Sequence, residues 1–576
     1  MQKHHYIFIL LLFFTLIYLA PLGVRPLLVP DESRYAEVPR EMVASGDWVV
    51  PQLNGLKYYE KPVMGYWVHA LSQQVFGQSN FAVRLPCAAS IGLVGFLIYT
   101  LLATTVGKED SRVYLAPLIF LSSLGMFAIG TSTVLDNVLN FFLTASVVSF
   151  YLASEKQSRS SGEKALLLVA GIFVGCAFMT KGFLAFVVPI ISVIPYLLWQ
   201  RRGKEIIRML CWPAVSAVLV SLPWSIMIHL KDPDFWNFFF WHEHVKRFFS
   251  DNAQHQESFW FYFLTIIPLF SPWIFLLPAA FSGLFNESNR GEKLVRLIGL
   301  CVCWFVFPFL FFSISNGKLA TYILPCFAPL AILTAIGLYG SIKGSRKFLG
   351  LGISIFTFLA TVGLLAIIGT QILGFHVISL PELIWKYGAD SLRYSDTLWK
   401  PLLVAGSLLF MVVLCFMALR CKHGGKKLVL LALSPVLLMI SSCIALPDLT
   451  LVVKGPGIFL EKKIKSIPDN AIVISDPETV AAACWYLKRS DLFLFKGWGE
   501  LKYGLAKPEG KLRFLKYAEI QQLIDSKQER PIVLILKTKN WARYRHKFSE
   551  PHELSSSGRY GHSIVKYEPF SKSSKT

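Results

Sequence analysis

Long apolar runs separated by short polar stretches occupy most of the chain, from residue 6 to residue 446. Most runs have the length of about 20 residues that a helix needs to cross a bilayer, and few charges interrupt them. The pattern therefore predicts about thirteen transmembrane helices, the first of which is a retained span rather than a cleaved signal peptide. We expect them at residues 6–24, 82–105, 112–131, 134–153, 164–180, 183–200, 206–229, 259–283, 294–314, 319–341, 347–372, 399–419 and 427–446.

The pattern changes after Leu446. Apolar stretches of strand length now alternate with stretches of helical period. We expect strands at 471–476, 491–495, 531–537 and 562–568, and helices at 478–489 and 517–527. The chain should therefore consist of a transmembrane domain over residues 1–446 and a small α/β domain over residues 447–576.

Composition agrees with an α-helical polytopic membrane protein. Of the 576 residues, 54% are hydrophobic and 14% are aromatic, which is more apolar surface than a soluble enzyme buries. The net charge of +21 could indicate nucleic acid, but no zinc-finger, helix-turn-helix or RNA-binding pattern is present. We therefore expect membrane lipids as partners and no nucleic acid. Nearly all ten cysteines lie in apolar runs, which indicates small buried side chains rather than disulfides.

Lysine and arginine gather in alternate short loops, which is typical of the cytoplasmic side of a membrane protein. The opposite face then receives every long segment, namely the loops 25–80 and 231–258 and the C-terminal domain. The cytoplasmic loops are too short for a nucleotide-binding domain, and no glycine-rich phosphate loop is present. From Leu446 onward there are 23 Lys and Arg against 14 Asp and Glu, an excess that suits an anionic partner.

The loop 25–80 concentrates charged and aromatic residues directly behind the first span. Asp31 and Glu32 stand near its start, and Glu60–Lys61 precedes an aromatic segment. Asp31 could simply cap a helix, and Glu60–Lys61 could be a surface ion pair. The neighbours that favour a functional site include Arg34 and Tyr35.

Ionisable residues beside apolar runs are costly to desolvate, which makes them candidates for function. They fall at the outer ends of the predicted spans and are Asp136, Lys181, Arg247 and Lys318. Taken singly, Asp136 could cap a hairpin and Lys181 could extend to the interface. Four such charges on the side of Asp31 indicate one shared site. A transporter would instead carry charges near the membrane midplane and an internal repeat, and we find neither in the sequence.

These residue types favour transfer of a sugar from a lipid-linked phosphate. The cations that could hold the phosphate as a leaving group are Lys61, Lys181, Arg247 and Lys318. The carboxylates that could surround a sugar's hydroxyls, amine or cationic transition state are Asp31, Glu60 and Asp136. His242 and His244 point to different sides of a helix, but one of them could complete a metal site with Glu60.

Several motifs resemble those of the bacterial aminoarabinose transferases, which are related to the protein O-mannosyltransferases of the GT-C superfamily. The motifs span roughly the first three fifths of the chain and include PDESRYAEVPREMVASGDWVVP, KYYEKPVMGYW, AIGTSTVLD, MTKGFLAFVVP, PDFWNFFFWHEHVKRF and FFSISNGKLATYILP. The resemblance implies a GT-C fold and inverting transfer of 4-amino-4-deoxy-L-arabinose from undecaprenyl phosphate to lipid A phosphate. It also implies a periplasmic active site in the inner membrane, and resistance to polymyxin and cationic peptides.

Residue chemistry and resemblance together assign the site. Asp31, Glu60 and Asp136 are the expected catalytic acids. The expected substrate-binding residues are Glu32, Arg34, Tyr35, Lys61, Lys181, His244, Arg247, Lys318 and Tyr322. We expect no required cofactor, and a divalent metal stays open. The alternatives are another polyprenyl-phosphate sugar, a protein acceptor, or a lipid transporter.

Overall fold

The computed structural model describes residues 2–241, 256–286, 291–343, 347–369, 397–526 and 529–568. They form two compact units. The helical unit contains the described residues of Met1–Leu22, Arg84–His376 and Leu398–Ala445, and the loop–tail unit contains those of Gly23–Val83, Val377–Thr397 and Leu446–Thr576. One boundary between the units falls at Leu446, and the loop 25–80 belongs to the same compact unit as the tail.

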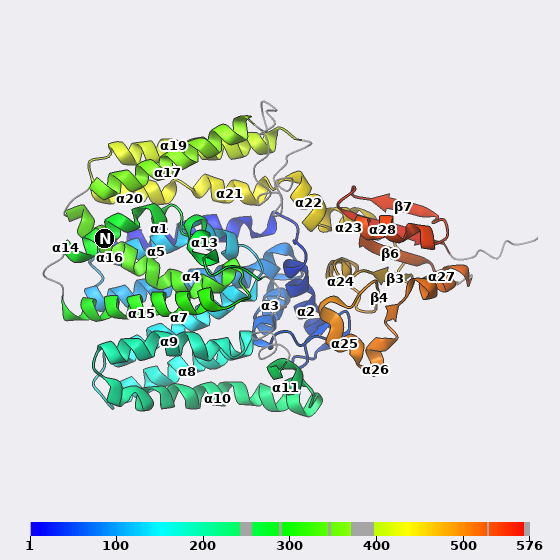
Figure 1. Ribbon diagram of the computed structural model, residues 1–576, viewed down its shortest axis with the longest axis horizontal. Coiled ribbons are helices and arrows are strands. Elements are labelled where there is room, and N and C mark those ends of the chain that lie inside the picture. The colour runs from blue at the N-terminus through cyan, green and yellow to red at the C-terminus, as the bar shows by residue number, and fades with distance from the viewer. Residues whose placement is uncertain are drawn as a thin grey trace, which may run out of the picture. The chain divides into compact units, whose positions relative to one another are not determined.

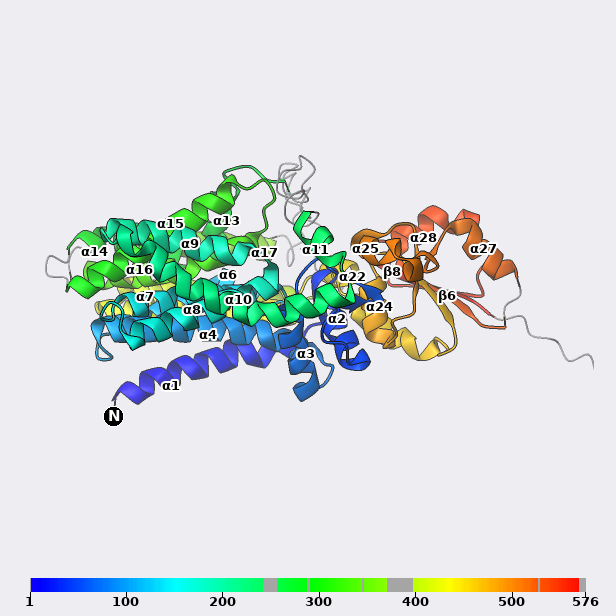
Figure 2. The same ribbon diagram turned by 90° about the horizontal axis from the view of Figure 1, so that it is seen from below.

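Ten helices of the described chain are long and apolar enough to cross a membrane, and two bent pairs raise the number to as many as twelve. The ten are His5–Gly23 (α1 with η1 and η2), Asn80–Val106 (α4), Leu135–Ser154 (α7), Ser161–Lys181 (α8), Gly203–Lys231 (η3 and α10), Glu292–Ile314 (α15), Ala320–Lys343 (η6 and α16), Phe348–Ile367 (in α17), Trp399–Arg420 (α19) and Gly424–Ile444 (α20 and α21). Figures 1 and 2 show the long helices of this unit side by side.

Two of the predicted spans are bent rather than straight. Arg112–Leu121 (α5) and Leu124–Gly130 (α6) meet at 60°, and Phe261–Leu269 (α13) and Trp273–Phe285 meet at 102°. Each predicted span coincides with one of these helices or pairs, or with Leu184–Trp199 (α9), which is an apolar helix shorter than the others. The predicted α-helical membrane fold is confirmed, with ten to twelve spans by length and composition in the described chain and the shorter apolar helix α9 beside them.

The bends have local causes. The Ser122 and Ser123 hydroxyls donate to the carbonyls of Leu118 and Ile119, in competition with helix amides. In the second pair, Pro268 lies inside the helix and lacks the amide that would continue it. The two breaks also contact each other, because the Trp273 indole donates to Ser122 Oγ at 3.0 Å.

The tail of the loop–tail unit is built on a six-stranded sheet of order β5-β4-β3-β6-β8-β7. Its strands are Phe514–Leu515 (β5), Phe493–Phe495 (β4), Ile472–Ser475 (β3), Ile532–Lys537 (β6), His562–Tyr567 (β8) and Glu553–Ser556 (β7). The first four are parallel, and β8 and β7 run antiparallel. The four predicted strands are found. The other two, β5 and β7, were not predicted because one has two residues and the other is a mostly exposed polar edge.

The loop of this unit packs onto the tail. It contains Asp31–Ser45 (α2), the hairpin Gln52–Leu53 (β1) and Leu56–Lys57 (β2), and Met64–Phe76 (α3). Ala36 of α2 shares an apolar cluster with Trp485 of Val480–Leu487 (α24), and Figure 1 shows the two helices side by side. The remaining tail elements are Asp448–Lys454 (α22), Gly457–Lys463 (α23), Ile464–Ser466 (η9), Gly499–Leu501 (η10), Lys502–Ala506 (α25), Pro508–Lys511 (α26), Tyr517–Asp525 (α27), Thr538–Tyr544 (α28) and Arg545–Lys547 (η11).

The hairpin turn is joined to the tail by hydrogen bonds. Asn54 and Gly55 both have positive φ, which the Asn-Gly pair favours in a two-residue hairpin. The Asn54 side chain donates to Leu492 O at 2.8 Å and accepts from Leu492 N at 2.9 Å, as a neighbouring strand would. The chain thus binds its first long loop to the sheet domain through backbone-like contacts.

Candidate active site

Asp31 stands exposed at the start of α2. The helix begins at Asp31, and the N-cap position before it is Pro30, without a side-chain cap. The carboxylate is therefore not the capping group that its position allowed, and its side chain is 52% exposed. Arg34, one turn later, holds it with Nη2 at 3.1 Å from Oδ1. Asp31 is thus an accessible carboxylate with a fixed cationic partner.

Arg34 is the centre of this group. Its side chain is 8% exposed and forms an ion pair with Glu500 of η10. Arg34 Nη1 also donates to the Tyr58 hydroxyl at 3.3 Å, which in turn donates to Glu500 Oε2 at 3.0 Å. Burial alone would lower the pKa of Arg34, but Tyr58, Tyr35, Glu500 and Asp31 raise it above its usual value. The guanidinium therefore stays charged.

Tyr35 and Glu32 lie in different surroundings and have different partners. Tyr35 is buried, with its ring 6.3 Å from that of Tyr66, and Arg34 lies over it at 5.5 Å. Glu32 is buried and pairs with Arg25 through contacts of 2.7 and 3.0 Å. It also accepts the Leu28 amide at 2.9 Å, so it organises the chain before the helix. This engagement argues against the substrate-binding role predicted for Glu32, whereas Tyr35 supports Arg34.

Glu60 and Lys61 lie half-buried beyond the hairpin, in the same unit. The Lys61 ammonium donates to the Glu60 backbone carbonyl at 2.8 Å. Tyr58 and Tyr59, which precede them, are fully buried and fix the backbone at this point. The pair thus follows a rigid segment that also contributes the Tyr58 hydroxyl to Arg34.

The helical unit contains a second charged group. Lys181 Nζ lies 2.5 Å from Asp136 Oδ1, and both side chains are 13% exposed. Asp136 is in the first turn of α7 and Lys181 is the last residue of α8, so each charge is favoured by the dipole of its own helix. Lys181 Nζ also lies 4.4 Å from the centre of the Tyr322 ring. The structure thus brings together three of the predicted site residues.

Lys318 is nearly buried between α15 and η6. Its ammonium donates to the Glu257 carbonyl at 2.8 Å, and burial lowers its pKa. Gln256 pairs with Gly317 as a short bridge, and the Tyr262 hydroxyl donates to Leu319 O at 3.1 Å. Sequence reasoning gave Tyr262 and Glu257 no role in the site, although both lie in the segment DNAQHQESFWFY, which also carries the resemblance. His244 and Arg247 lie outside the described residues, as does His242 of the metal hypothesis.

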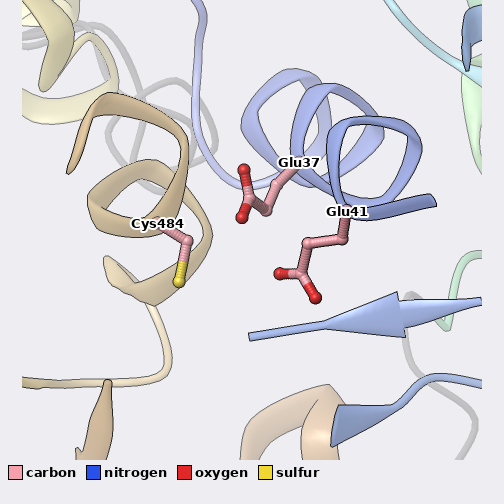
Figure 3. Close-up of side chains that lie close together, drawn as sticks. All are labelled: Glu37, Glu41 and Cys484. Atoms are coloured by element: carbon pink, nitrogen blue, oxygen red, sulfur yellow. The ribbon is translucent and has the colours of Figure 1, made fainter. Parts of the chain in front are cut away.

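One cluster of metal-ligand residue types occurs in the described part of the chain: Glu37, Glu41 and Cys484, whose ligand atoms lie within 4.8 Å of one another. Figure 3 shows the two carboxylates of α2 facing the thiol of α24. Arg40 donates to both oxygens of Glu37, at 2.7 and 2.6 Å. The Asn54 and Gly55 amides donate to Glu41 at 2.6 and 2.8 Å. These hydrogen bonds explain why the two carboxyl groups are buried, and they indicate a structural role between the loop and the tail.

Burial raises the pKa of Glu37 well above 4.5, despite the attraction of Arg40, and also raises the pKa of Glu41. The folded chain therefore keeps a proton that the unfolded chain loses above pH 4.5. The free energy of unfolding should therefore fall as pH rises from 4.5 towards the raised pKa of Glu37, by up to about 1.4 kcal/mol per pH unit. Thermal unfolding of the full chain in detergent measures this slope.

Glu37→Gln should flatten the slope, because glutamine carries no titrating proton. The exposed Glu509 offers the matched control Glu509→Gln, which should leave the slope as it is. Equal slopes for wild type and Glu37→Gln would contradict a buried proton on Glu37.

A cavity of about 150 Å³ lies between α7, α8, α9 and α10. Its walls are almost wholly apolar and include Val147, Phe150, Val174 and Phe186. Such a lining suits hydrocarbon and offers very little polar surface to a sugar.

Two family models match the chain. Residues 4–239 match the dolichyl-phosphate-mannose-protein mannosyltransferase family, and residues 451–564 match the arabinosyl transferase ArnT C-terminal domain. Among solved structures, ArnT from Cupriavidus metallidurans bound to undecaprenyl phosphate has a TM-score of 0.79 at 22% identity and covers 98% of both chains. The oligosaccharyltransferase AglB from Archaeoglobus fulgidus has a TM-score of 0.51 at 10% identity, over 95% of this chain and 70% of that one. These two likenesses confirm the fold.

Several sequence relatives are more similar to this chain than these solved structures are. The undecaprenyl phosphate-α-4-amino-4-deoxy-L-arabinose arabinosyl transferase of Shewanella sediminis is 36% identical over 91% of this chain and 92% of its own length. The corresponding transferase 1 of Sodalis glossinidius is 39% identical over 89% of this chain and 87% of its own. With such identity over nearly the whole length, the chain belongs to the family of undecaprenyl phosphate-α-4-amino-4-deoxy-L-arabinose arabinosyl transferases.

Proposed function

We propose that this chain transfers 4-amino-4-deoxy-L-arabinose from undecaprenyl phosphate to a phosphate of lipid A, at the periplasmic face of the bacterial inner membrane. Family membership supports the enzyme class, the sugar and the lipid carrier. The single structural observation that carries the proposal is the accessible Asp31 carboxylate held by the buried Arg34. An accessible carboxylate with a fixed cationic partner suits the binding of a polar substrate.

The acceptor decides the chemistry that Asp31 must perform. A lipid A phosphate is already ionised at neutral pH, so it needs little help from a general base. Asp31 therefore orients the acceptor or binds the ammonium of the amino sugar. An acceptor phosphate oxygen attacks the anomeric carbon from the face opposite the carrier, which inverts the configuration. The new carbon–oxygen bond forms as the bond to the carrier phosphate breaks, and undecaprenyl phosphate leaves with the electron pair.

The lysines supply the complementary charge for the leaving phosphate. Lys181 and Lys318 are positive groups held in place near the ends of apolar helices, and Lys61 is a third in the loop. Cations fixed before the reaction stabilise the charge that develops on the departing phosphate. We propose that these lysines, with Arg247, bind the carrier phosphate, and that the mechanism needs no metal or other cofactor.

Mass spectrometry of lipid A tests the proposed function. Cells that lack the chain should have lipid A without aminoarabinose, and complementation should restore the modified species together with polymyxin resistance. Lipid A that is the same in both strains would refute the proposal.

A protein acceptor is the second candidate, because residues 4–239 match the protein mannosyltransferase family. A hydroxyl acceptor would require Asp31 as a general base. Aminoarabinose on a membrane protein, with unmodified lipid A, would favour this alternative.

Labelling of single cysteines tests the proposed orientation. A cysteine at Gln78 should react with a membrane-impermeant maleimide in intact spheroplasts, and one at Lys204 should react only after lysis. Both positions are exposed, and a background without the exposed Cys211 and the half-buried Cys176, Cys303 and Cys421 leaves only buried thiols in the described chain. Gly55 is unsuitable, because its φ is +67° and a Cβ would lie 2.5 Å from Ser490 O. The opposite labelling pattern would place the site in the cytoplasm and contradict the proposal.

A further inference from the structure

Glu500 lies in the tail, within a segment that carries no recognisable motif, yet its carboxylate reaches the start of α2. It pairs with Arg34 Nη1 and accepts the Tyr58 hydroxyl at 3.0 Å. Its side chain is 36% exposed, whereas Arg34 is 8% exposed. Glu500 thus contacts an almost buried guanidinium from the open side.

The backbone around Glu500 is held against the loop from both sides. Before it, Gly499 has a φ of +51°, and a Cβ there would lie 2.8 Å from Pro477. After it, the Tyr503 ring lies 4.8 Å from that of Tyr59. A Cβ on Gly504 would lie 2.8 Å from the Lys57 carbonyl, so the tail backbone touches the hairpin itself. The packing of the neighbouring backbone therefore fixes the position of Glu500. Its contact with Arg34 does not depend on a mobile surface side chain.

The guanidinium divides its two terminal nitrogens between two carboxylates. Nη1 faces Glu500 and Tyr58, and Nη2 donates to Asp31. A planar fork with one arm fixed has its other arm fixed as well. Glu500 consequently determines where Nη2 lies, and Nη2 is the contact that orients the exposed Asp31 carboxylate.

We propose that Glu500 is a positioning residue for sugar transfer, which orients Asp31 through Arg34 and makes the tail a part of the active site. This inference rests on the proposed function, in which Asp31 binds acceptor or sugar. An ordinary exposed ion pair would contribute little and would leave the reaction rate unchanged. Misplacement of a reacting group by about 1 Å can instead cost about 100-fold in rate.

Purified full-length variants in detergent, with undecaprenyl phosphate-linked aminoarabinose and lipid A, test this role. Glu500→Gln keeps the size of the side chain and should lower kcat by about 10- to 100-fold, with little change in the KM of the donor. Glu500→Asp keeps the charge and should recover part of the rate. Glu509→Gln, also in the tail and exposed, is the control and should behave as wild type. Wild-type kcat for a folded Glu500→Gln would overturn the proposal.

A double variant tests whether Glu500 acts through Arg34. In an Arg34→Met background, Glu500→Gln should cause no further loss, because the link is already broken. If Glu500→Gln lowers kcat by the same factor with and without Arg34, Glu500 acts independently of Arg34 and the proposal is overturned.

Hydrogen–deuterium exchange tests the positioning role of Glu500 without any assumption about the acceptor. Exchange in the peptide from Pro30 to Met42 should rise in Glu500→Gln and stay unchanged in Glu509→Gln. Unchanged exchange in Glu500→Gln would overturn the positioning role, whatever the substrate is. If exchange rises while wild type modifies an acceptor other than lipid A, the positioning role stands and the proposed function fails.

Discussion

Asp31→Asn should reduce transfer of the sugar by about 100-fold, the loss expected when the group that orients a reacting partner is removed. Asparagine has the same shape, and Arg34 keeps its contacts with Glu500 and Tyr58. The lost pair is half exposed, so its contribution to the free energy of unfolding is at most about 1 kcal/mol. The variant should therefore fold and lose its activity.

Complementation of a strain that lacks the chain measures this effect. Asp31→Asn should be present in membranes at wild-type level, with unmodified lipid A and polymyxin sensitivity. Asp469→Asn changes an exposed aspartate of the same unit and should complement fully. Retained resistance with Asp31→Asn would remove Asp31 from the mechanism.

Lys181→Met should be the second most damaging substitution, with a loss of about 10- to 100-fold in kcat/KM for the lipid-linked donor. A hydrogen bond to a charged group contributes about 1.5–3 kcal/mol, which corresponds to that range. The ammonium lies between Asp136 and the Tyr322 ring, 2.5 Å from the carboxylate and 4.4 Å from the ring centre. Methionine fills the same space without the charge.

The Asp136 partner allows a stricter test of the same residue. Lys181→Met leaves a partly buried carboxylate unpaired, and adding Asp136→Asn removes that imbalance. If Lys181 binds the carrier phosphate, the double variant should fold better than Lys181→Met and should still bind undecaprenyl phosphate poorly. Lys426→Met, at an exposed lysine in the first turn of α20, should leave binding unchanged. If the double variant binds undecaprenyl phosphate as wild type does, Lys181 has only a structural role as the ion-pair partner of Asp136.

The membrane fold was largely predictable, because long apolar runs report directly on helices that cross a bilayer. The bends at Ser122–Ser123 and after Pro268 were not predicted, although serine pairs and prolines are known causes. Each of those spans remains apolar through its bend, so hydropathy alone gives no sign of a change in direction.

The candidate site was predictable as a set of residues but not as a set of contacts. Asp136 and Tyr322 belong to two separate predicted spans and Lys181 to the turn between two others, and the structure brings the three together. Glu32 stands next to Asp31 in sequence but points to Arg25, since consecutive helical residues face different directions.

Glu500 illustrates the limit of sequence reasoning most clearly. It belongs to the tail, which has no catalytic motif, and it meets Arg34 only because the hairpin packs on the sheet domain. The Asn54–Gly55 turn was a signal for the hairpin itself. Nothing local in the sequence indicates which distant strand that hairpin contacts.

Reconstituted transfer is the most direct measurement of the central claim. Purified protein in vesicles would receive undecaprenyl phosphate-linked aminoarabinose and lipid A as the only substrates, with products identified by mass spectrometry. We predict aminoarabinose-modified lipid A and one undecaprenyl phosphate released per sugar transferred, with wild-type protein and not with Asp31→Asn. Unmodified lipid A in the presence of folded wild-type protein and intact donor, or equal product from Asp31→Asn, would contradict the account.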